Sequence, residues 1–400
     1  MSKKNDDFFK EKKVWSEVKD ELLGCYFKPY AQKIFHTYKP LVYVDCFAGK
    51  GKFEDGKPGS PLIALDIINE CVQSTTMESV TISTYFIDLN YASDLQANLK
   101  DYPNVNIISG RFEEKILDVL KNKRGSNVFL YIDPYGIKAL NCSMFDNLMS
   151  NGFNSIELLI NLNSFGFIRE ACNAMGTRFD ESDLFDDLIE YDPSTFVANE
   201  KSIGDLNEIA GGDYWQQIII EYKDKKIDGY EAESRFAEAY CKRLNRKYKY
   251  VLNLPLRIRR GQRPKYRMIH ATNHKDGCLL MVDNIYNRWQ ALKNIQDQGQ
   301  MCLFEESYDN EIIDNDTIEK KMRAFFPMYK QFISISDSLA DFFVAHGAIC
   351  STGTVKDILK KWEKQGLIDI YRNPDKTSKG KPATYMTEGA GKSVSLRWKN

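Results

Sequence analysis

Two segments of this sequence place polar residues directly after short apolar runs. In residues 43–51, Tyr-Val-Asp-Cys-Phe-Ala-Gly-Lys-Gly, an apolar run leads into Asp45 and then into a turn of small residues. In residues 128–136, a second run leads into Asp133, Pro134, Tyr135 and a glycine. Because glycine has no Cβ atom, the backbone at Gly49 and Gly51 can approach a ligand that any other residue would block. The pattern predicts a ligand-binding turn after the first run and a polar site after the second.

The spacing of the glycines disfavours two common nucleotide-binding motifs. A dinucleotide fingerprint requires G-x-G-x-x-G, and only Gly49-Lys50-Gly51 is present. A P-loop requires Gly-Lys followed by Ser or Thr, whereas Gly51-Lys52 is followed by Phe53. A different ligand is therefore expected at this turn.

A third acidic residue, Asp88, ends the next apolar run in the chain. An acid after a strand commonly caps the following helix, and that interpretation stays open. Together with the turn at residues 45–51, however, Asp88 becomes a candidate ligand of a bound cofactor.

The first segment resembles the Asp-x-Phe-Ala-Gly-x-Gly element of class I S-adenosylmethionine-dependent methyltransferases, especially those that act on nucleic-acid bases. The resemblance implies that Asp45 lies near the amino group of the cofactor and that Asp88 accepts hydrogen bonds from both ribose hydroxyls. It also implies that a short stretch of backbone lines the methionine part of S-adenosylmethionine. The residues of that stretch are Phe47, Ala48, Gly49 and Gly51.

The second segment is similar to the Asp/Asn-Pro-Pro-aromatic motif of amino-methyltransferases. That similarity implies that the Asp133 side chain and the Pro134 carbonyl orient an exocyclic amine, while an aromatic ring stacks on the flipped base. Tyr135 stands where the second proline belongs and Gly136 where the aromatic belongs, so stacking would fall to Tyr135. The alternative is a strand followed by an ordinary Asp-Pro turn.

A wider set of motifs extends along most of the chain. They are Trp15-x-x-x-Lys19-x-x-Leu22 with Tyr26-Phe27, residues 45–51, Gly59-Ser60-Pro61-Leu62, residues 132–136 and residues 268–274. As a set these motifs resemble the three-Cys-motif partner protein (TcmP) family. The family resemblance implies a methyltransferase-like fold and a partner related to radical-S-adenosylmethionine proteins with three cysteines. It leaves open both the substrate and whether catalysis is retained.

Short apolar runs alternating with helical stretches predict a parallel α/β sheet, in which strands are covered on both faces. The fold class expected is α/β, a Rossmann-like class I methyltransferase sheet with a helical insertion, followed by a winged helix-turn-helix. The expected organisation is a helical extension (1–40), a methyltransferase-like domain (41–295) with an acidic helical insertion at about 166–240, a linker (296–324) and a winged helix (325–400). The expected strands are 41–46, 81–87, 105–108, 128–132 and 156–162, then a hairpin of 249–257 and 265–272 at the sheet edge.

Charge is segregated along the chain although the net charge is only −1. Residues 178–213 hold eleven acidic and two basic residues, whereas residues 242–267 hold eleven basic and no acidic ones. Residues 350–400 hold eleven basic and five acidic residues, which suits a polyanion such as DNA or RNA.

The C-terminal module is expected to run helix, helix, strand, basic loop and strand. Its helices are predicted at 332–344 and from Ser351-Thr352 to Gln365, and its strands at 367–372 and 383–386. The second helix places lysines on its solvent face and the loop carries further basic residues, so both are candidate nucleic-acid contacts. The candidates are Lys356, Lys360, Arg372, Lys379 and Lys381.

Composition excludes several other classes of protein. Apolar residues make up 43% of the chain and no run of about 18 apolar residues occurs, so a folded protein without a membrane segment is expected. The nine cysteines lack any C-x-x-C pair, which predicts reduced thiols in the cytoplasm and no cysteine zinc site. His270 and His274 lack an adjacent acidic ligand, so a structural role is favoured over a metal site.

The resulting hypothesis is methyl transfer from S-adenosylmethionine to a base of DNA or RNA, with or without the three-cysteine partner. The alternative is a non-catalytic nucleic-acid-binding or adaptor protein that keeps the fold.

Overall fold

The computed structural model describes residues 6–74, 80–180, 196–256, 264, 266–297 and 313–399. The chain divides into two compact units. The first comprises residues 1–258 and 264–273, and the second comprises residues 259–263 and 274–400.

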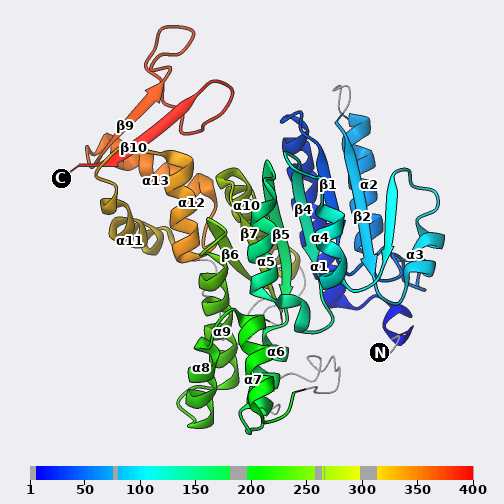
Figure 1. Ribbon diagram of the computed structural model, residues 1–400. Coiled ribbons are helices and arrows are strands. Elements are labelled where there is room, and N and C mark those ends of the chain that lie inside the picture. Colours follow the sequence, from blue (N-terminus) through cyan, green and yellow to red (C-terminus); the bar gives the residue numbers. More distant parts are fainter. Residues whose placement is uncertain are drawn as a thin grey trace. The chain divides into compact units, whose positions relative to one another are not determined.

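A seven-stranded sheet forms the centre of the first unit, in the order β3-β2-β1-β4-β5-β7-β6 (Figure 1). Neighbouring strands from β3 to β5 pair in parallel, whereas β7 is antiparallel to both β5 and β6. The strands are β1 (Leu41–Asp45), β2 (Ile82–Asp88), β3 (Val105–Ser109), β4 (Asn127–Ile132), β5 (Ser155–Leu162), β6 (Tyr250–Leu256) and β7 (Tyr266–Thr272).

The order of the five parallel strands is that of a doubly wound Rossmann sheet. The direction of strand succession reverses between β1 and β4, and in such sheets the ligand crevice lies outside the carboxyl ends of the strands at that point. The predicted α/β, Rossmann-like fold class is confirmed. The expected edge hairpin forms, with β6 at the edge, and its Arg-Arg-Gly-Gln-Arg-Pro turn lies largely outside the described residues.

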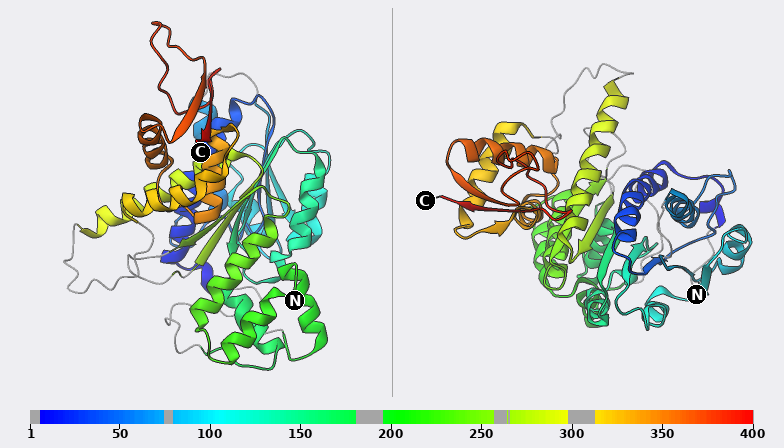
Figure 2. Two further views of the ribbon diagram at one scale, coloured as in Figure 1. Left: turned by 90° about the vertical axis from the view of Figure 1, so that its left-hand side faces the viewer. Right: turned by 90° about the horizontal axis from the view of Figure 1, so that it is seen from above.

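The two faces of the sheet differ in chemistry because strand side chains alternate. One face carries Val44, Leu130 and Leu158, which join the main apolar cluster with residues of the later helices. The other face carries Tyr43 and Phe129, which pack against aromatic residues of helix α1 (Val14–Phe35). The views in Figure 2 show α1 and α2 (Ser60–Ser74) beside each other over the sheet. The predicted helical extension (1–40) thus consists, in its described residues, of the 22-residue helix α1 preceded by a short 3-10 turn, Asp6–Phe9.

Helices connect the parallel strands, and a group of four separates β5 from β6 at the lower end of Figure 1. This group occupies the predicted insertion, of which residues 181–195 lie outside the described part. The connecting helices are α3 (Ala92–Asn98), α4 (Phe112–Leu120) and α5 (Cys142–Leu148). The group of four is α6 (Ser164–Ala174), α7 (Glu200–Ala210), α8 (Tyr214–Lys223) and α9 (Gly229–Leu244).

The described residues of the second unit form four α-helices and a small sheet in the order β8-β10-β9. From β8 on, the element order is strand, helix, helix, strand, long loop and strand, whereas the predicted order begins with the first helix and lacks β8. The helices are α10 (Lys275–Asp297), α11 (Asn315–Phe325), α12 (Ile335–His346) and α13 (Thr352–Lys364). The strands are β8 (Ile333–Ser334), β9 (Ile368–Asn373) and β10 (Ser393–Trp398).

Three details of the predicted C-terminal half differ from the structure. Residues 383–386 are not a strand, and the strand that pairs with β9 is β10. Part of the predicted linker forms α11, whose N-terminus is capped by Asp314. Helix α10 belongs to the second unit, whereas the sequence places it at the end of the first domain.

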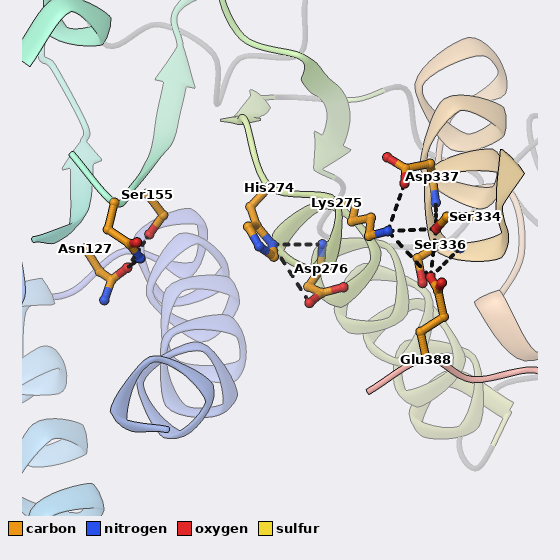
Figure 3. Close-up of polar contacts among 10 residues, drawn as sticks. Asn127, Ser155, His274, Lys275, Asp276, Ser334, Ser336, Asp337 and Glu388 are labelled. Carbon is orange, nitrogen blue, oxygen red and sulfur yellow. Dashed lines mark hydrogen bonds and ion pairs between the residues drawn. The ribbon is translucent and has the colours of Figure 1, made fainter. Parts of the chain in front are cut away.

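Lys275, at the start of α10, ties this helix to the rest of the second unit (Figure 3). Its ammonium group donates to Ser334 Oγ at 2.7 Å and to Asp337 Oδ2 at 2.8 Å, and lies 3.5 Å from Glu388 Oε2. The Ser351 side chain caps α13 by accepting from the Thr354 N–H at 3.1 Å. Among the helices that the structure describes, none is long and apolar enough to cross a bilayer.

Candidate functional site

The turn that follows β1 is organised from within by Asp45. This side chain is fully buried and accepts hydrogen bonds from Ser60 Oγ at 2.6 Å and from the Phe47 N–H at 3.2 Å. Burial raises the pKa of Asp45 to about 7, although both hydrogen bonds oppose that rise. Asp45 thus joins the turn to the N-terminus of α2, and its predicted contact with a cofactor's amino group remains a proposal.

Asp88, at the end of β2, holds the same turn from the other side. Its Oδ2 accepts from the Gly49 N–H at 2.9 Å, and its Oδ1 accepts from the N–H groups of Asn90 and Tyr91 at 2.7 Å each. The last two bonds close a turn directly after β2, whereas α3 begins only at Ala92 and has no side-chain cap, so the capping role that the sequence left open is not seen. A carboxylate has about four acceptor positions, so a further donor such as a ribose hydroxyl can still be accommodated.

The two glycines of the turn are required by neighbouring side chains as well as by their conformation. Gly49 and Gly51 have φ values of 58° and 76°. A Cβ at Gly49 would lie 2.9 Å from Phe9 Cζ, and one at Gly51 would lie 2.8 Å from Leu95 Cδ1. The sequence predicts that the missing Cβ atoms leave room for a ligand. This explanation is wrong, because protein side chains fill the space where a Cβ would stand at both glycines.

Phe47 and Ala48 complete the turn between the glycines and Asp45. The partly buried ring of Phe47 lies 5.4 Å from the ring of Phe112, which starts α4 directly after β3. Ala48 is 5% exposed, and its N–H donates to the Ile87 carbonyl at 3.0 Å. Phe47 thus joins the turn to the start of α4, and Ala48 joins it to β2.

Asp133 follows β4 and is paired with a lysine from α1. Lys19 Nζ donates to both carboxylate oxygens of Asp133, at 2.9 and 2.7 Å, and Asn161 Nδ2 donates to Oδ1 at 2.7 Å. Pro134 is buried, while Tyr135 is 48% exposed. The structure therefore places Asp45, Asp88 and Asp133 at the carboxyl ends of β1, β2 and β4, as predicted.

A second lysine and a further acid extend this charged group. Lys12 Nζ lies 2.6 Å from Asp20 Oδ2 and donates to the Pro58 carbonyl at 2.7 Å. Burial raises the pKa of Asp20 to about 6, Lys12 opposes this rise, and the nearby Asp133 adds to it. The carboxyl groups of Asp20, Asp45 and Asp133 thus lie close to one another, near the carboxyl ends of β1 and β4. Two ammonium groups, of Lys12 and Lys19, pair with Asp20 and Asp133.

Two buried polar atoms near Asp133 lack a hydrogen-bond partner among the described residues. They are Asn161 Oδ1, on β5, and the hydroxyl of Tyr131, on β4. Buried polar atoms are nearly always paired in proteins, so an ordered water or a ligand group is expected beside them. This observation fits a site that holds a polar molecule.

The histidines do not form a metal site in the described part of the chain. His270 is buried under α1, where its Nε2 lies 3.0 Å from Glu157 Oε2 and 3.1 Å from the Tyr26 hydroxyl. His274 belongs to the second unit and is exposed, with its Nδ1 3.3 Å from the Asp276 N–H (Figure 3). No group of three potential ligands that could hold a metal ion occurs among the residues described.

The candidate nucleic-acid contacts in the second unit separate into exposed and structural residues. Lys379 and Lys381 are exposed in the loop between β9 and β10, and Lys360 is exposed on α13 beside Asp357 at 2.9 Å. Lys356 is half-buried on α13. Arg372 differs from these lysines, because its guanidinium makes two hydrogen bonds to Glu363, at 2.6 and 2.7 Å, and a third to the Tyr385 carbonyl.

Sequence reasoning missed the contribution of the N-terminal region to this site. Lys12, Lys19 and Asp20 precede the sheet, and Phe9 reaches the glycine turn from still farther upstream. Lys19 lies within the Trp15-x-x-x-Lys19 motif of the family resemblance, which was the available signal. Asn161 ends an apolar run without a recognisable motif.

Comparison with known proteins gives weak likenesses. No family model and no curated protein matches the chain. Among solved structures, a putative methyltransferase, yhhF, from Escherichia coli aligns with 15% identity and a TM-score of 0.22, over 34% of this chain and 66% of that one. The DszA carbon methyltransferase aligns with 8% identity and a TM-score of 0.29, over 58% and 47%.

A putative zinc-dependent alcohol dehydrogenase from Rhodobacter sphaeroides also aligns, with 14% identity and a TM-score of 0.25, over 65% and 98%. The alignment thus spans about two thirds of yhhF and about half of the DszA enzyme. At such identities and TM-scores, these likenesses support no argument about activity.

Proposed function

We propose that this protein transfers a methyl group from S-adenosylmethionine to an amino group of a base in DNA or RNA. The observation that carries the proposal is the meeting of three features at the switch point of a Rossmann-like sheet. These are the glycine turn after β1, the carboxylate of Asp88 after β2 and the Asp133-Pro134 pair after β4. Ligand crevices in such sheets lie at this position.

In the proposed complex, the turn from Phe47 to Gly51 and the Asp88 carboxylate hold the cofactor, which supplies an electrophilic methyl group. The ring of Phe47 provides an apolar surface for the adenine. Asp45 holds the turn through its hydrogen bonds with the Phe47 N–H and Ser60 Oγ. Asp133 and the Pro134 carbonyl orient the amine, so that its lone pair faces the methyl group, and Tyr135 stacks on the base.

The exposed lysines of the second unit would bring the nucleic acid to the enzyme. Lys360, Lys379 and Lys381 have the exposure that contact with phosphates requires. A radical-S-adenosylmethionine-like partner with three cysteines belongs to the same proposal, through the resemblance to the TcmP family.

One observation favours a second candidate, a non-catalytic nucleic-acid-binding or adaptor protein. Lys19 and Asn161 already donate three hydrogen bonds to Asp133, and these occupy acceptor positions that a substrate amine would need. A catalytic Asp133 must use its remaining lone pairs or exchange one of these donors for the substrate.

A methyl-transfer assay separates the two candidates. Purified protein is incubated with tritiated-methyl S-adenosylmethionine and mixed DNA and RNA, and label in nucleic acid is counted. We expect transfer that falls at least tenfold in Asp133→Ala and severalfold in Tyr135→Ala, while Phe332→Ala in the second unit serves as a control. Binding of cofactor and nucleic acid without any transfer would instead support the adaptor.

A further inference from the structure

We propose that the N-terminal 3-10 segment, Asp6–Phe9, forms the outer wall of the cofactor site, with Phe9 as its positioning residue. The inference rests on the proposed use of S-adenosylmethionine and assigns to this site a segment that precedes the fold. Its observations lie within the first unit and concern the contacts of residues 6–12 with the glycine turn.

Phe9 makes the closest approach to the turn. Two of its ring carbons lie 2.9 and 3.0 Å from the position that a Cβ of Gly49 would occupy. The ring is also 4.9 Å from that of Tyr91, after β2, and 5.7 Å from that of Phe53, after the turn. Phe9 is only 8% exposed, so these contacts bury it against the residues that flank the proposed cofactor site.

Lys50, between the two glycines, adds polar contacts to the same segment. Its ammonium group lies 3.0 Å from Asp6 Oδ1 and stands 5.2 Å from the ring centre of Phe9 and 5.4 Å from that of Tyr91. Cations above aromatic rings are attracted by the negative face of the ring. The central residue of the glycine turn is therefore bound to the N-terminal segment by charge as well as by packing.

Two hydrogen bonds then attach Phe9 and the residues that follow it to the loop after the turn. The Glu54 N–H donates to the Phe9 carbonyl at 2.8 Å, and the Lys12 N–H donates to Asp55 Oδ2 at 3.1 Å. A 3-10 helix of four residues has little stability of its own. Its order consequently depends on the turn and on this loop.

Gly49 thus has two neighbours: its N–H donates to Asp88, and the Phe9 ring fills the space that a Cβ of Gly49 would occupy. A cofactor that binds this conformation of the turn also stabilises the contacts of Phe9. Conversely, Phe9 stabilises the conformation that binds the cofactor. This coupling is reciprocal, because two events that share one conformation raise each other's stability by the same factor. The segment therefore acts as a wall that supports the cofactor rather than as an obstruction.

The first test is calorimetric titration of the full-length protein with S-adenosylmethionine and with its demethylated product. We expect Phe9→Ala to raise both dissociation constants by about tenfold, which corresponds to about 1.4 kcal/mol of binding free energy. Phe179→Ala is the matched control, because Phe179 is also a buried phenylalanine of the first unit, 4% exposed, but packs against Tyr222 in the helical insertion. Its dissociation constants should rise at most about twofold.

The second test does not depend on the folding of a variant. In hydrogen exchange on the wild-type protein, the N–H groups of Lys12 and Glu54 report the contacts of the segment. Saturating cofactor should slow their exchange, whereas the exchange of the Leu396 N–H in the second unit should not change. Unchanged exchange at Lys12 and Glu54, or equal affinity of Phe9→Ala and wild type, would overturn the proposal.

Tighter binding of S-adenosylmethionine by Phe9→Ala would also overturn the proposal, because the segment would then compete with the cofactor. The proposed function would stand in that case, since the protein still binds S-adenosylmethionine. If neither wild type nor Phe9→Ala binds S-adenosylmethionine, the proposed function fails, and the wall fails with it.

Discussion

The ion pair between Lys19 and Asp133 connects the N-terminal helix to the proposed reaction site. Lys19 is 10% exposed in its side chain and Asp133 is 23% exposed, so water screens the pair only in part. Removal of one partner leaves an uncompensated charge in a poorly hydrated position, which costs more than the pair itself contributes.

Lys19→Met should therefore lower the free energy of unfolding of the first unit by about 2 kcal/mol, less than for a fully buried pair. In the background of Asp133→Asn the same substitution should cost less than half as much, because no carboxylate is left unpaired. Denaturant unfolding of the four proteins of this cycle measures the coupling. Equal costs in both backgrounds would show that Lys19 acts through packing alone.

The buried carboxyl group of Asp45 makes stability depend on pH. Its pKa is raised by burial to about 7, so the folded protein binds a proton that the unfolded chain releases near its ordinary value of 3.8. The stabilisation from this proton is complete below about pH 4 and is lost as pH rises through about 7.

Asp45→Asn removes this dependence and keeps an acceptor for the Phe47 N–H, while its amide NH2 can donate to Ser60 Oγ in place of the bond that Oδ2 accepted. The stability of the variant relative to wild type should therefore rise between pH 4 and pH 8, by on the order of 4 kcal/mol. Thermal unfolding across this pH range measures the difference. A constant difference would mean that Asp45 is ionised throughout the range.

Among the elements, the strands of the first unit were the most predictable part. All seven were predicted to within one residue at each end, because strands covered on both faces are continuous apolar runs. Helix α11 was missed because Ile318 and Met322 are its only buried residues within a polar stretch that looks like a linker. Strand β10 was missed although Val394 and Leu396 are buried in alternation, because a shorter apolar run at residues 383–386 competed with it.

The candidate site was predictable only where it follows a strand. The acids after β1, β2 and β4 were found because each ends an apolar run at the edge where ligands bind. The role of Lys19 was not predicted, because Lys19 and its partner Asp133 are 114 residues apart in the sequence and no local pattern encodes their contact. Phe9 was missed for the same reason, and the open space expected at the glycines turned out to be filled by protein side chains.

Within the second unit, Arg372 joins strand β9 to helix α13 through Glu363. Its side chain is 9% exposed and makes three hydrogen bonds to Glu363 and Tyr385, so it is a structural residue. Arg372→Met should lower the unfolding free energy of this unit by about 1 to 2 kcal/mol. Nucleic-acid affinity, measured below the unfolding temperature, should change less than twofold, and a loss comparable to that of the loop lysines would contradict the assignment.

For the whole molecule, the separation of charge implies that nucleic-acid binding and cofactor binding can be altered independently. Lys379 and Lys381 lie exposed in the second unit, whereas the residues proposed to hold the cofactor belong to the first. Lys379→Ala/Lys381→Ala in the full chain should weaken binding of a DNA or RNA duplex severalfold at low salt. It should also reduce the slope of log affinity against log salt by about 1 to 2, since up to two phosphate contacts are removed.

The same variant should bind S-adenosylmethionine with unchanged affinity. Fluorescence anisotropy of labelled duplexes at several salt concentrations, together with calorimetry for the cofactor, measures both quantities on one preparation. Lys223→Ala/Lys226→Ala, at the end of α8 in the first unit, is the matched control and should leave the salt slope as it is. An equal loss in both variants would mean that binding follows the overall charge, because a protein without a defined phosphate site responds to total charge rather than to its position.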